Sequence, residues 1–138
     1  MSQPTISGSC LCGNVRYSIT GPFKTFQYCH CSRCRKVTGS AFSPNIFVPP
    51  MQFKWLQGKE HIGRYEYPDA KYFTTCFCKM CGSTLPWTVK TGVNVIVPAG
   101  TLDEMPPIEP KQNIFWSSKA GWYKNPAELQ CFDEFPRQ

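Results

Sequence analysis

Nine cysteines dominate the residues of this 138-residue chain that could do chemistry, and seven of them fall into three short clusters. The first cluster has one residue between its two cysteines. The third has two residues between them and a glycine directly after, which is the pattern of a zinc knuckle. Together these two clusters supply four sulfurs, the number that a tetrahedral zinc ion needs. We therefore predict a structural zinc ion held by Cys10, Cys12, Cys78 and Cys81.

The middle cluster supplies three sulfurs within six residues, from Cys29, Cys31 and Cys34. Catalytic zinc sites commonly have three protein ligands and keep the fourth position for water or substrate, whereas structural sites fill all four. A thiol bound in such an open position would be held as a thiolate. We therefore predict a second zinc ion at these three cysteines, which we also expect to be the catalytic residues. Each chain would then hold two zinc ions, of which the second can be partly occupied.

Four further residues could take part in this chemistry, and a fifth, Cys131, is assigned no chemical role. His30 could ligate the second ion, but its neighbours on both sides already face the metal in an extended chain, so we expect its ring to point away. Arg33 and Arg35 could lower cysteine pKa values or bind a substrate carboxylate, and two solvated arginines explain them equally well. Cys76 could close the second site, although we favour an ordinary buried cysteine. Cys131 lies among phenylalanines, where we expect a free thiol packed against aromatic rings.

Composition and charge limit the class of protein. A chain of 138 residues with 41% hydrophobic residues has the size and core of one domain, so we expect a single zinc-binding domain over residues 1–138. The chain shows no signal-like start and no apolar run long enough for a bilayer, and its odd number of cysteines argues against a disulfide scaffold. These features predict a cytoplasmic protein with no membrane association. The fifteen lysines and arginines behind the net charge of +6 are spread along the chain and form no basic stripe, which argues against a nucleic-acid partner.

The elements that must position the cysteines are short strands. Six segments alternate apolar and polar residues or are rich in aromatic and β-branched residues, and we predict a strand over each: 15–19, 41–48, 53–56, 63–67, 72–77 and 93–97. Turn signals separate these segments, and thirteen prolines leave room only for short helices, at 32–37 and 126–129. The sequence therefore predicts a mainly β fold with little helix.

Several ordered motifs match one known protein family. They are Gly8-Ser-Cys10-Leu-Cys12-Gly13, Cys29-His30-Cys31-Ser-Arg-Cys34, Phe77-Cys78-Lys-Met-Cys81-Gly82-Ser83 and Ile114-Phe115-Trp116-Ser-Ser-Lys119-Ala120-Gly121-Trp122-Tyr123. On these residues the chain resembles the glutathione-dependent formaldehyde-activating enzyme and centromere protein V family. The resemblance implies a small tent of short antiparallel β-sheets, with one structural zinc ion and one zinc ion near the active cleft. It assigns them to the same two cysteine sets that the spacing predicts.

The same resemblance implies an activity. The family's founding reaction condenses formaldehyde with glutathione to S-hydroxymethylglutathione, which is formally the reverse of a carbon–sulfur lyase reaction. We therefore expect a zinc-dependent carbon–sulfur lyase-type enzyme whose partners are a small thiol such as glutathione and an aldehyde. The alternatives are a zinc-stabilised module that binds protein or nucleic acid without catalysis, and a redox or zinc-buffering protein. One departure bears on proton handling, because Asn113 stands where the family often has histidine.

Aromatic residues leave one more choice open. Trp55, Trp87, Trp116, Trp122 and Tyr123 could line a cleft for the carbon skeleton of a ligand. Packing in the core is the default for such rings, and we favour it. The oligomeric state and the substrate are not predicted.

Overall fold

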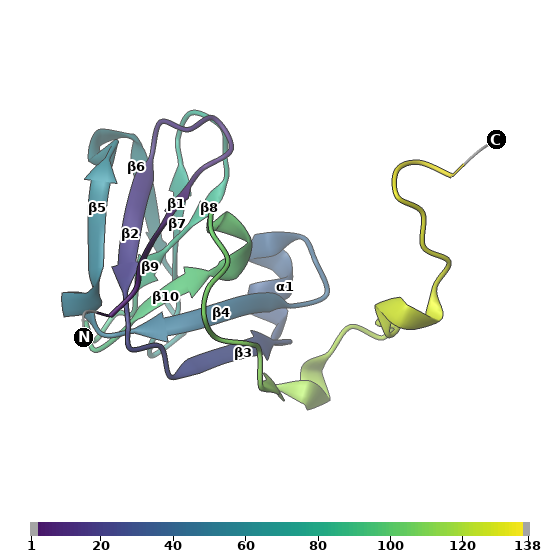
Figure 1. Ribbon diagram of the computed structural model, residues 1–138. Coiled ribbons are helices and arrows are strands. Elements are labelled where there is room, and N and C mark those ends of the chain that lie inside the picture. Colours follow the sequence, from purple (N-terminus) through teal and green to yellow (C-terminus); the bar gives the residue numbers. More distant parts are fainter. Residues whose placement is uncertain (1–2, 137–138) are drawn as a thin grey trace.

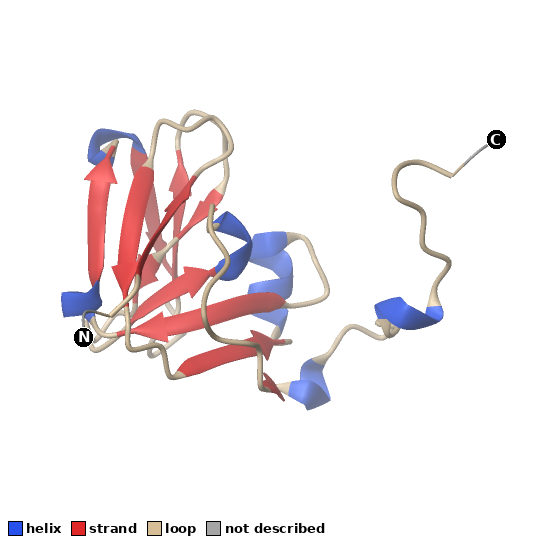
Figure 2. Ribbon diagram, in the orientation of Figure 1, coloured by secondary structure: helices blue, strands red, loops and turns tan. Residues whose placement is uncertain are grey.

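The computed structural model of the protein describes residues 3–136, which form three small β-sheets and one α-helix (Figure 1, Figure 2). The first sheet is antiparallel, with its strands in the order β1-β2-β5. Its strands are Thr5–Ser9 (β1), Arg16–Thr20 (β2) and Phe53–Gln57 (β5). Strands β1 and β2 pair Gly8 with Tyr17, and a Cβ atom on this glycine would come within 2.3 Å of the tyrosine ring. Only glycine therefore leaves room for the buried ring.

The second sheet has five strands in the order β11-β3-β4-β10-β9. Its neighbouring strands run antiparallel, except that β11 and β3 are parallel. All four residues of β10 are buried. The bounds are Thr25–Cys29 (β3), Ser43–Val48 (β4), Trp87–Thr88 (β9), Val95–Pro98 (β10) and Gln112–Ile114 (β11).

The third sheet is antiparallel in the order β6-β7-β8. Its strands are Ile62–Glu66 (β6), Thr74–Cys78 (β7) and Thr84–Leu85 (β8). Burial alternates along β7, so Thr74, Cys76 and Cys78 face the interior while Phe77 faces outward. This alternation brings Cys78 to the end of a buried strand face.

The helical segments are short. The α-helix is Ser32–Thr38 (α1), which begins after Cys31 and ends at Gly39 in the left-handed conformation. Single 3-10 turns follow along the chain at Pro50–Gln52 (η1), Lys59–His61 (η2), Ala99–Thr101 (η3), Trp116–Ser118 (η4) and Pro126–Glu128 (η5). None of them is long enough to be stable without packing against the sheets.

Two apolar clusters hold the sheets together. The larger joins the first and second sheets and has Tyr17, Ile19 and Ile46 at its centre, each with no exposed surface. The smaller includes Val15, Cys76 and Leu85 and joins the first sheet to the third. Figure 1 shows β2 and β5 standing across β3 and β4, as the sides of a tent stand on its floor.

The predicted mainly β fold with little helix is confirmed, and each of the six predicted strand segments overlaps an observed strand. The prediction missed β1, β3, β8, β9 and β11, each of which has five residues or fewer. It also expected antiparallel sheets, whereas β11 runs parallel to β3. The predicted helix at 32–37 is α1, and the one at 126–129 is a single 3-10 turn. No helix within residues 3–136 is long and apolar enough to cross a membrane.

Candidate metal centres

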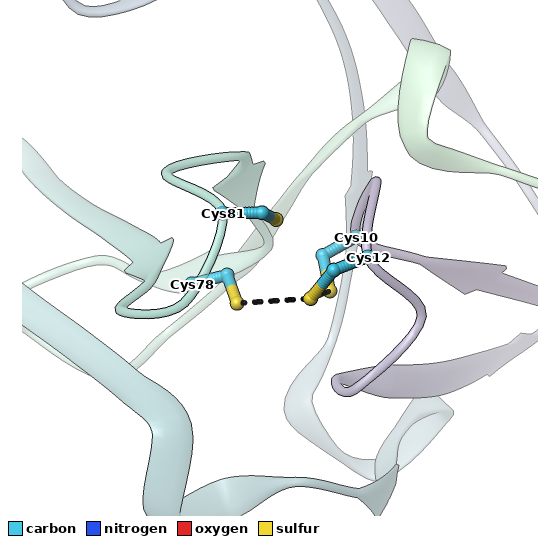
Figure 3. Close-up of side chains that lie close together, drawn as sticks. All are labelled: Cys10, Cys12, Cys78 and Cys81. Atoms are coloured by element: carbon cyan, nitrogen blue, oxygen red, sulfur yellow. Dashed lines mark hydrogen bonds between the residues drawn. The ribbon is translucent and has the colours of Figure 1, made fainter.

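Cys10, Cys12, Cys78 and Cys81, which we call the four-cysteine cluster, meet between two turns. Figure 3 shows Cys10 and Cys12 on the turn after β1, Cys78 at the end of β7 and Cys81 on the turn that follows, with their sulfurs close together. All four Sγ atoms lie within 4.8 Å of each other. The Sγ atoms of Cys10 and Cys12 are 3.5 Å apart, and those of Cys12 and Cys78 are 3.8 Å apart. Tetrahedral Zn–S bonds of about 2.3 Å put sulfurs roughly 3.8 Å apart, so the donor set fits zinc.

The two turns have the same construction. Gly13 and Gly82 have φ angles of 80° and 78°, in the left-handed region that glycine tolerates best. Each glycine N–H donates to the carbonyl of the first cysteine of its pair. Gly13 donates to Cys10 at 3.0 Å, and Gly82 donates to Cys78 at 2.8 Å. The chain therefore reverses directly after each cysteine pair, and the thiols point out of the turn.

Ser83 is a supporting residue whose role sequence reasoning missed. Its Oγ lies 3.1 Å from the Sγ of Cys81 and accepts a hydrogen bond from the N–H of Leu11 at 2.9 Å. The hydroxyl thus ties the two turns together. Hydrogen bonds from Ser83 lower the pKa of Cys81 to about 5, which favours the thiolate that binds metal. The signal in the sequence was the serine directly after Cys81-Gly82.

Cys29, Cys31 and Cys34, which we call the three-cysteine cluster, lie where β3 ends and α1 begins. Their three Sγ atoms lie within 4.8 Å of one another. The Sγ of Cys31 caps the helix by accepting a hydrogen bond from the N–H of Cys34 at 3.3 Å. Hydrogen bonds from the thiols of Cys29 and Cys34 lower the pKa of Cys31 to about 2, while the same contacts raise the pKa values of its two partners. Cys31 is therefore the cysteine of this cluster that most readily becomes a thiolate.

His30 lies outside this cluster, as expected from its neighbours. Its ring has no exposed surface and is packed among Phe42, Trp116 and Tyr123. Its Nε2 forms a 2.9 Å hydrogen bond with the Oδ1 of Asn113, while Nδ1 is buried without a protein partner. The amide that replaces the family's usual histidine therefore holds His30, 83 residues away in sequence.

The last two cysteines belong to neither cluster. Cys76 is buried in the core beside Leu85, and burial raises the pKa of its thiol, so it does not close the three-cysteine cluster. Cys131 is exposed, and its thiol donates to the carbonyl of Leu129 at 3.4 Å. The expectation that Cys131 packs against aromatic rings is wrong, because this part of the chain leaves the sheets (Figure 1) and Phe132 and Phe135 are exposed.

A cavity lies beside the three-cysteine cluster. Cys34 and Thr38 of α1 form one side of it, Ser43 and Asn45 of β4 another, and Trp87 closes it together with nearby side chains. The Ser43 hydroxyl donates to the side-chain oxygen of Asn45 at 2.6 Å, and both residues are buried. The cavity has a volume of about 10 Å³, roughly the room for one water molecule, and it places two polar side chains next to a cysteine of the cluster.

The aromatic residues divide between the core, the cavity and the surface. Trp55 packs against Tyr17 in the core, and Trp87 lines the cavity. Trp116 contacts the ring of His30, whereas Trp122 is 71% exposed. Of the five candidate cleft residues, only Trp87 lines this cavity, while Trp116 and Tyr123 pack on His30.

Comparison with known proteins shows the family of this chain. The sequence profile described as glutathione-dependent formaldehyde-activating enzyme matches residues 5–118, a stretch that includes both cysteine clusters. The chain belongs to this family. The predicted family is therefore confirmed, while kinship to centromere protein V stays a prediction. As a class of function, the family supports an enzyme of the formaldehyde-activating or lyase type.

Individual relatives are distant. A Halomonas elongata protein, whose name places it among the glutathione-dependent formaldehyde-activating enzymes, is 26% identical over 95% of this chain and 88% of its own length. An uncharacterised lyase of Schizosaccharomyces pombe is 28% identical over 67% of this chain and 64% of its own length. A solved Rhodobacter sphaeroides structure has a TM-score of 0.60 at 21% identity, covering 78% of this chain and 99% of that chain. At that identity the likeness shows a shared fold only.

Proposed function

We propose that this family member is a zinc-dependent carbon–sulfur lyase-type enzyme that joins a small thiol such as glutathione to an aldehyde, and catalyses the reverse. The observation that carries the proposal is the three-cysteine cluster, which has three sulfur ligands and lies beside a small cavity that Ser43 and Asn45 help to line. Among residues 3–136 no fourth metal-ligating side chain joins this cluster, whereas the other cluster is complete with four. Three protein ligands with the fourth coordination position left to water or substrate are typical of catalytic zinc sites.

The two clusters divide the work in this proposal. The four-cysteine cluster holds a structural zinc ion that crosslinks the first and third sheets within one domain. The three-cysteine cluster holds the catalytic ion, since three Sγ atoms within 4.8 Å can all be about 2.3 Å from one zinc. When bound there, zinc supplies Lewis acidity and lowers the pKa of a nearby thiol.

Asn45 is the residue that we assign to the aldehyde oxygen. Its side-chain oxygen already accepts the Ser43 hydroxyl, which leaves the amide NH₂ as the end that can donate into the cavity. As the carbon–sulfur bond forms, the electron pair of the C=O bond moves to oxygen, and a fixed donor stabilises this charge. The thiol has by then released its proton to solvent, and the new alkoxide takes a proton from solvent to give the hydroxymethyl adduct. The reverse reaction breaks the same bond.

Arg35 is the better candidate of the two arginines for binding a carboxylate of the thiol. It is half-buried, and its Nε is buried without a protein partner. The guanidinium of Arg33 instead lies over the ring of Tyr67, 5.0 Å from the ring centroid, on an exposed side chain. A half-buried guanidinium binds a carboxylate more strongly than a solvated one, because water screens it less.

The proposal is tested by exchange NMR on formaldehyde and reduced glutathione, with and without the zinc-loaded protein. The protein should accelerate interconversion with S-hydroxymethylglutathione, and Cys31→Ser should abolish the acceleration. Asn45→Ala should lower the rate constant roughly a hundredfold, as removal of an oxyanion donor does. Cys131→Ser is the matched control, because that thiol is exposed and lies outside both clusters, so its rate should equal that of the wild type.

Two results would count against the proposal. Acceleration that persists in Cys31→Ser with the second ion lost would remove the three-cysteine cluster from the reaction. No acceleration by a protein that holds two zinc ions would leave the metal centres in place and reject this thiol and aldehyde pair.

A further inference from the structure

Residues 124–136, which we call the C-terminal arm, do not pack on the sheets. Every residue of the arm is exposed, and Figure 1 shows it running away from the rest of the protein. Within residues 3–136, each hydrogen bond that the arm forms has both partners inside the arm. The arm nevertheless carries large apolar side chains, with Leu129 at 52%, Phe132 at 54% and Phe135 at 93% exposure. Burying large apolar side chains is favourable, so a surface that covers these three residues would stabilise the arm.

The direction of the arm is set where it leaves the sheets. Ala120 is buried, and the ring of Tyr123 packs edge-on against His30 and Phe42, with centroids 5.6 and 6.2 Å apart. The ring of Trp116 packs against the same histidine and against Tyr123. This anchor fixes the chain up to Tyr123 and points the following residues outward. The arm therefore does not cover its own sheets.

Charge is strongly segregated between the arm and the start of the chain. The arm carries Glu128, Asp133 and Glu134 against a single lysine, Lys124, and its acidic pair lies between Phe132 and Phe135. The first 59 residues contain seven lysines and arginines and no acidic residue at all. The arm and this acid-free part of the chain are thus electrostatically complementary.

The outer face of α1 offers a surface of matching chemistry. Arg33, Lys36 and Val37 are all exposed and share one face of the helix, because they are three and four residues apart. Arg33 also lies over the ring of Tyr67, which adds an aromatic surface beside the positive charge. A basic and apolar helix face suits a segment in which two phenylalanines flank two acidic residues.

We propose that the arm of one copy docks on α1 of a second copy, so that the protein is a dimer joined by exchanged arms. Thirteen extended residues span up to about 40 Å, enough to reach across a neighbouring molecule. Under two-fold symmetry each copy gives one arm and receives one, so every contact occurs twice. The docked arm would lie on the helix that carries Cys34, beside the three-cysteine cluster. This inference is independent of the proposed reaction.

Sedimentation velocity on the zinc-loaded full chain tests the dimer directly. The wild type should sediment as a dimer, and Phe132→Ala/Phe135→Ala should raise the dimer dissociation constant at least tenfold, since buried aromatic anchors dominate such contacts. Met51→Ala/Met105→Ala is the matched control, because these residues are 91% and 90% exposed and lie outside the arm and α1. The control should remain a dimer. Circular dichroism and zinc content should match the wild type in both variants, since the changed residues are exposed.

A charge exchange identifies the docking surface. Arg33→Glu/Lys36→Glu should weaken the dimer, and Asp133→Lys/Glu134→Lys should do the same, because each places like charges together. Combining all four substitutions should restore association. Dimerisation should also weaken as salt is raised. A monomeric wild type at 100-fold the concentration used for activity, or a dimer unaffected by the phenylalanine substitutions, would overturn the proposal. A combined variant that stays monomeric would overturn the assignment to α1.

Discussion

The four-cysteine cluster takes its sulfurs from two turns that are more than sixty residues apart, whereas the three-cysteine cluster takes all of its sulfurs from one six-residue segment. The first can assemble only when β1 and β7 have been brought together by the sheets, so metal binding there is coupled to folding. The second is built locally by the end of β3 and the first turn of α1. In the two-zinc protein that we propose, loss of the ion from the second cluster would therefore stop the reaction without removing a crosslink.

The largest effect should come from breaking the four-cysteine cluster. Cys78→Ser removes a fully buried ligand, and the binding energy of a structural zinc is comparable with the roughly 5–15 kcal/mol that stabilises a whole domain. We expect this variant to be largely unfolded by circular dichroism even with excess zinc. A native thermal transition for Cys78→Ser would show that the crosslink is dispensable.

The matching change in the three-cysteine cluster should leave the fold intact. Cys31→Ser should retain one zinc ion of two, as measured by elemental analysis, and its unfolding free energy should fall by no more than about 2 kcal/mol. The helix cap survives in part, because a serine hydroxyl can accept the N–H of Cys34. Global unfolding of this variant would erase the distinction between the two clusters.

The segment of the three-cysteine cluster also depends on a residue distant in sequence, because Asn113 holds His30 between Cys29 and Cys31. Asn113→Ala removes the hydrogen-bond partner of the buried His30 Nε2 and leaves both ring nitrogens without a protein partner. We expect a loss of about 1–3 kcal/mol in urea unfolding. Asn113→Asp keeps the accepting oxygen and is the control that should lose less. Equal losses in the two variants would contradict a role for this hydrogen bond.

The turns of the four-cysteine cluster can be tested at their glycines. Gly82→Ala meets no atom within 4 Å, so its cost of about 1 kcal/mol comes from the left-handed backbone alone. Gly100→Ala is the matched control, since it too meets open space but does not have a positive φ. In competition with a zinc chelator, Gly82→Ala should retain metal less well than the wild type. The control should retain metal as well as the wild type does. Similar retention by both would mean that the turn is not strained by a side chain.

The smallest effect concerns the buried thiol that ligates no metal. Burial raises the pKa of Cys76, so the unfolded state releases this proton first and stability falls as pH rises above the ordinary thiol value of about 8.5. Cys76→Ala should therefore flatten the decline of unfolding free energy above that pH, while its zinc content stays at the wild-type value. An unchanged slope would show that Cys76 does not titrate in this range.

The features predicted from the sequence are those that depend on residues close together in the chain. The spacing of the cysteines and the glycine after each pair indicated the turns, and alternation indicated β2, β4 and β10 within a few residues. The parallel pairing of β11 with β3 was not predictable in this way, because a three-residue strand carries no pattern that reveals its partner. The position of Ser43 and Asn45 beside Cys34 depends on how β4 packs against α1, and neither residue stands out in the sequence.

The amino-acid sequence by itself determined the family, the mainly β class and the two cysteine sets, because these depend on residue types at short spacings. Only the tertiary structure decided that Cys76 is buried away from both clusters, that Asn113 holds His30 and that residues 124–136 leave the sheets. Each of these facts depends on which distant segments pack together. Packing is set by the shape and burial of the whole core, so no single segment of the chain contains it.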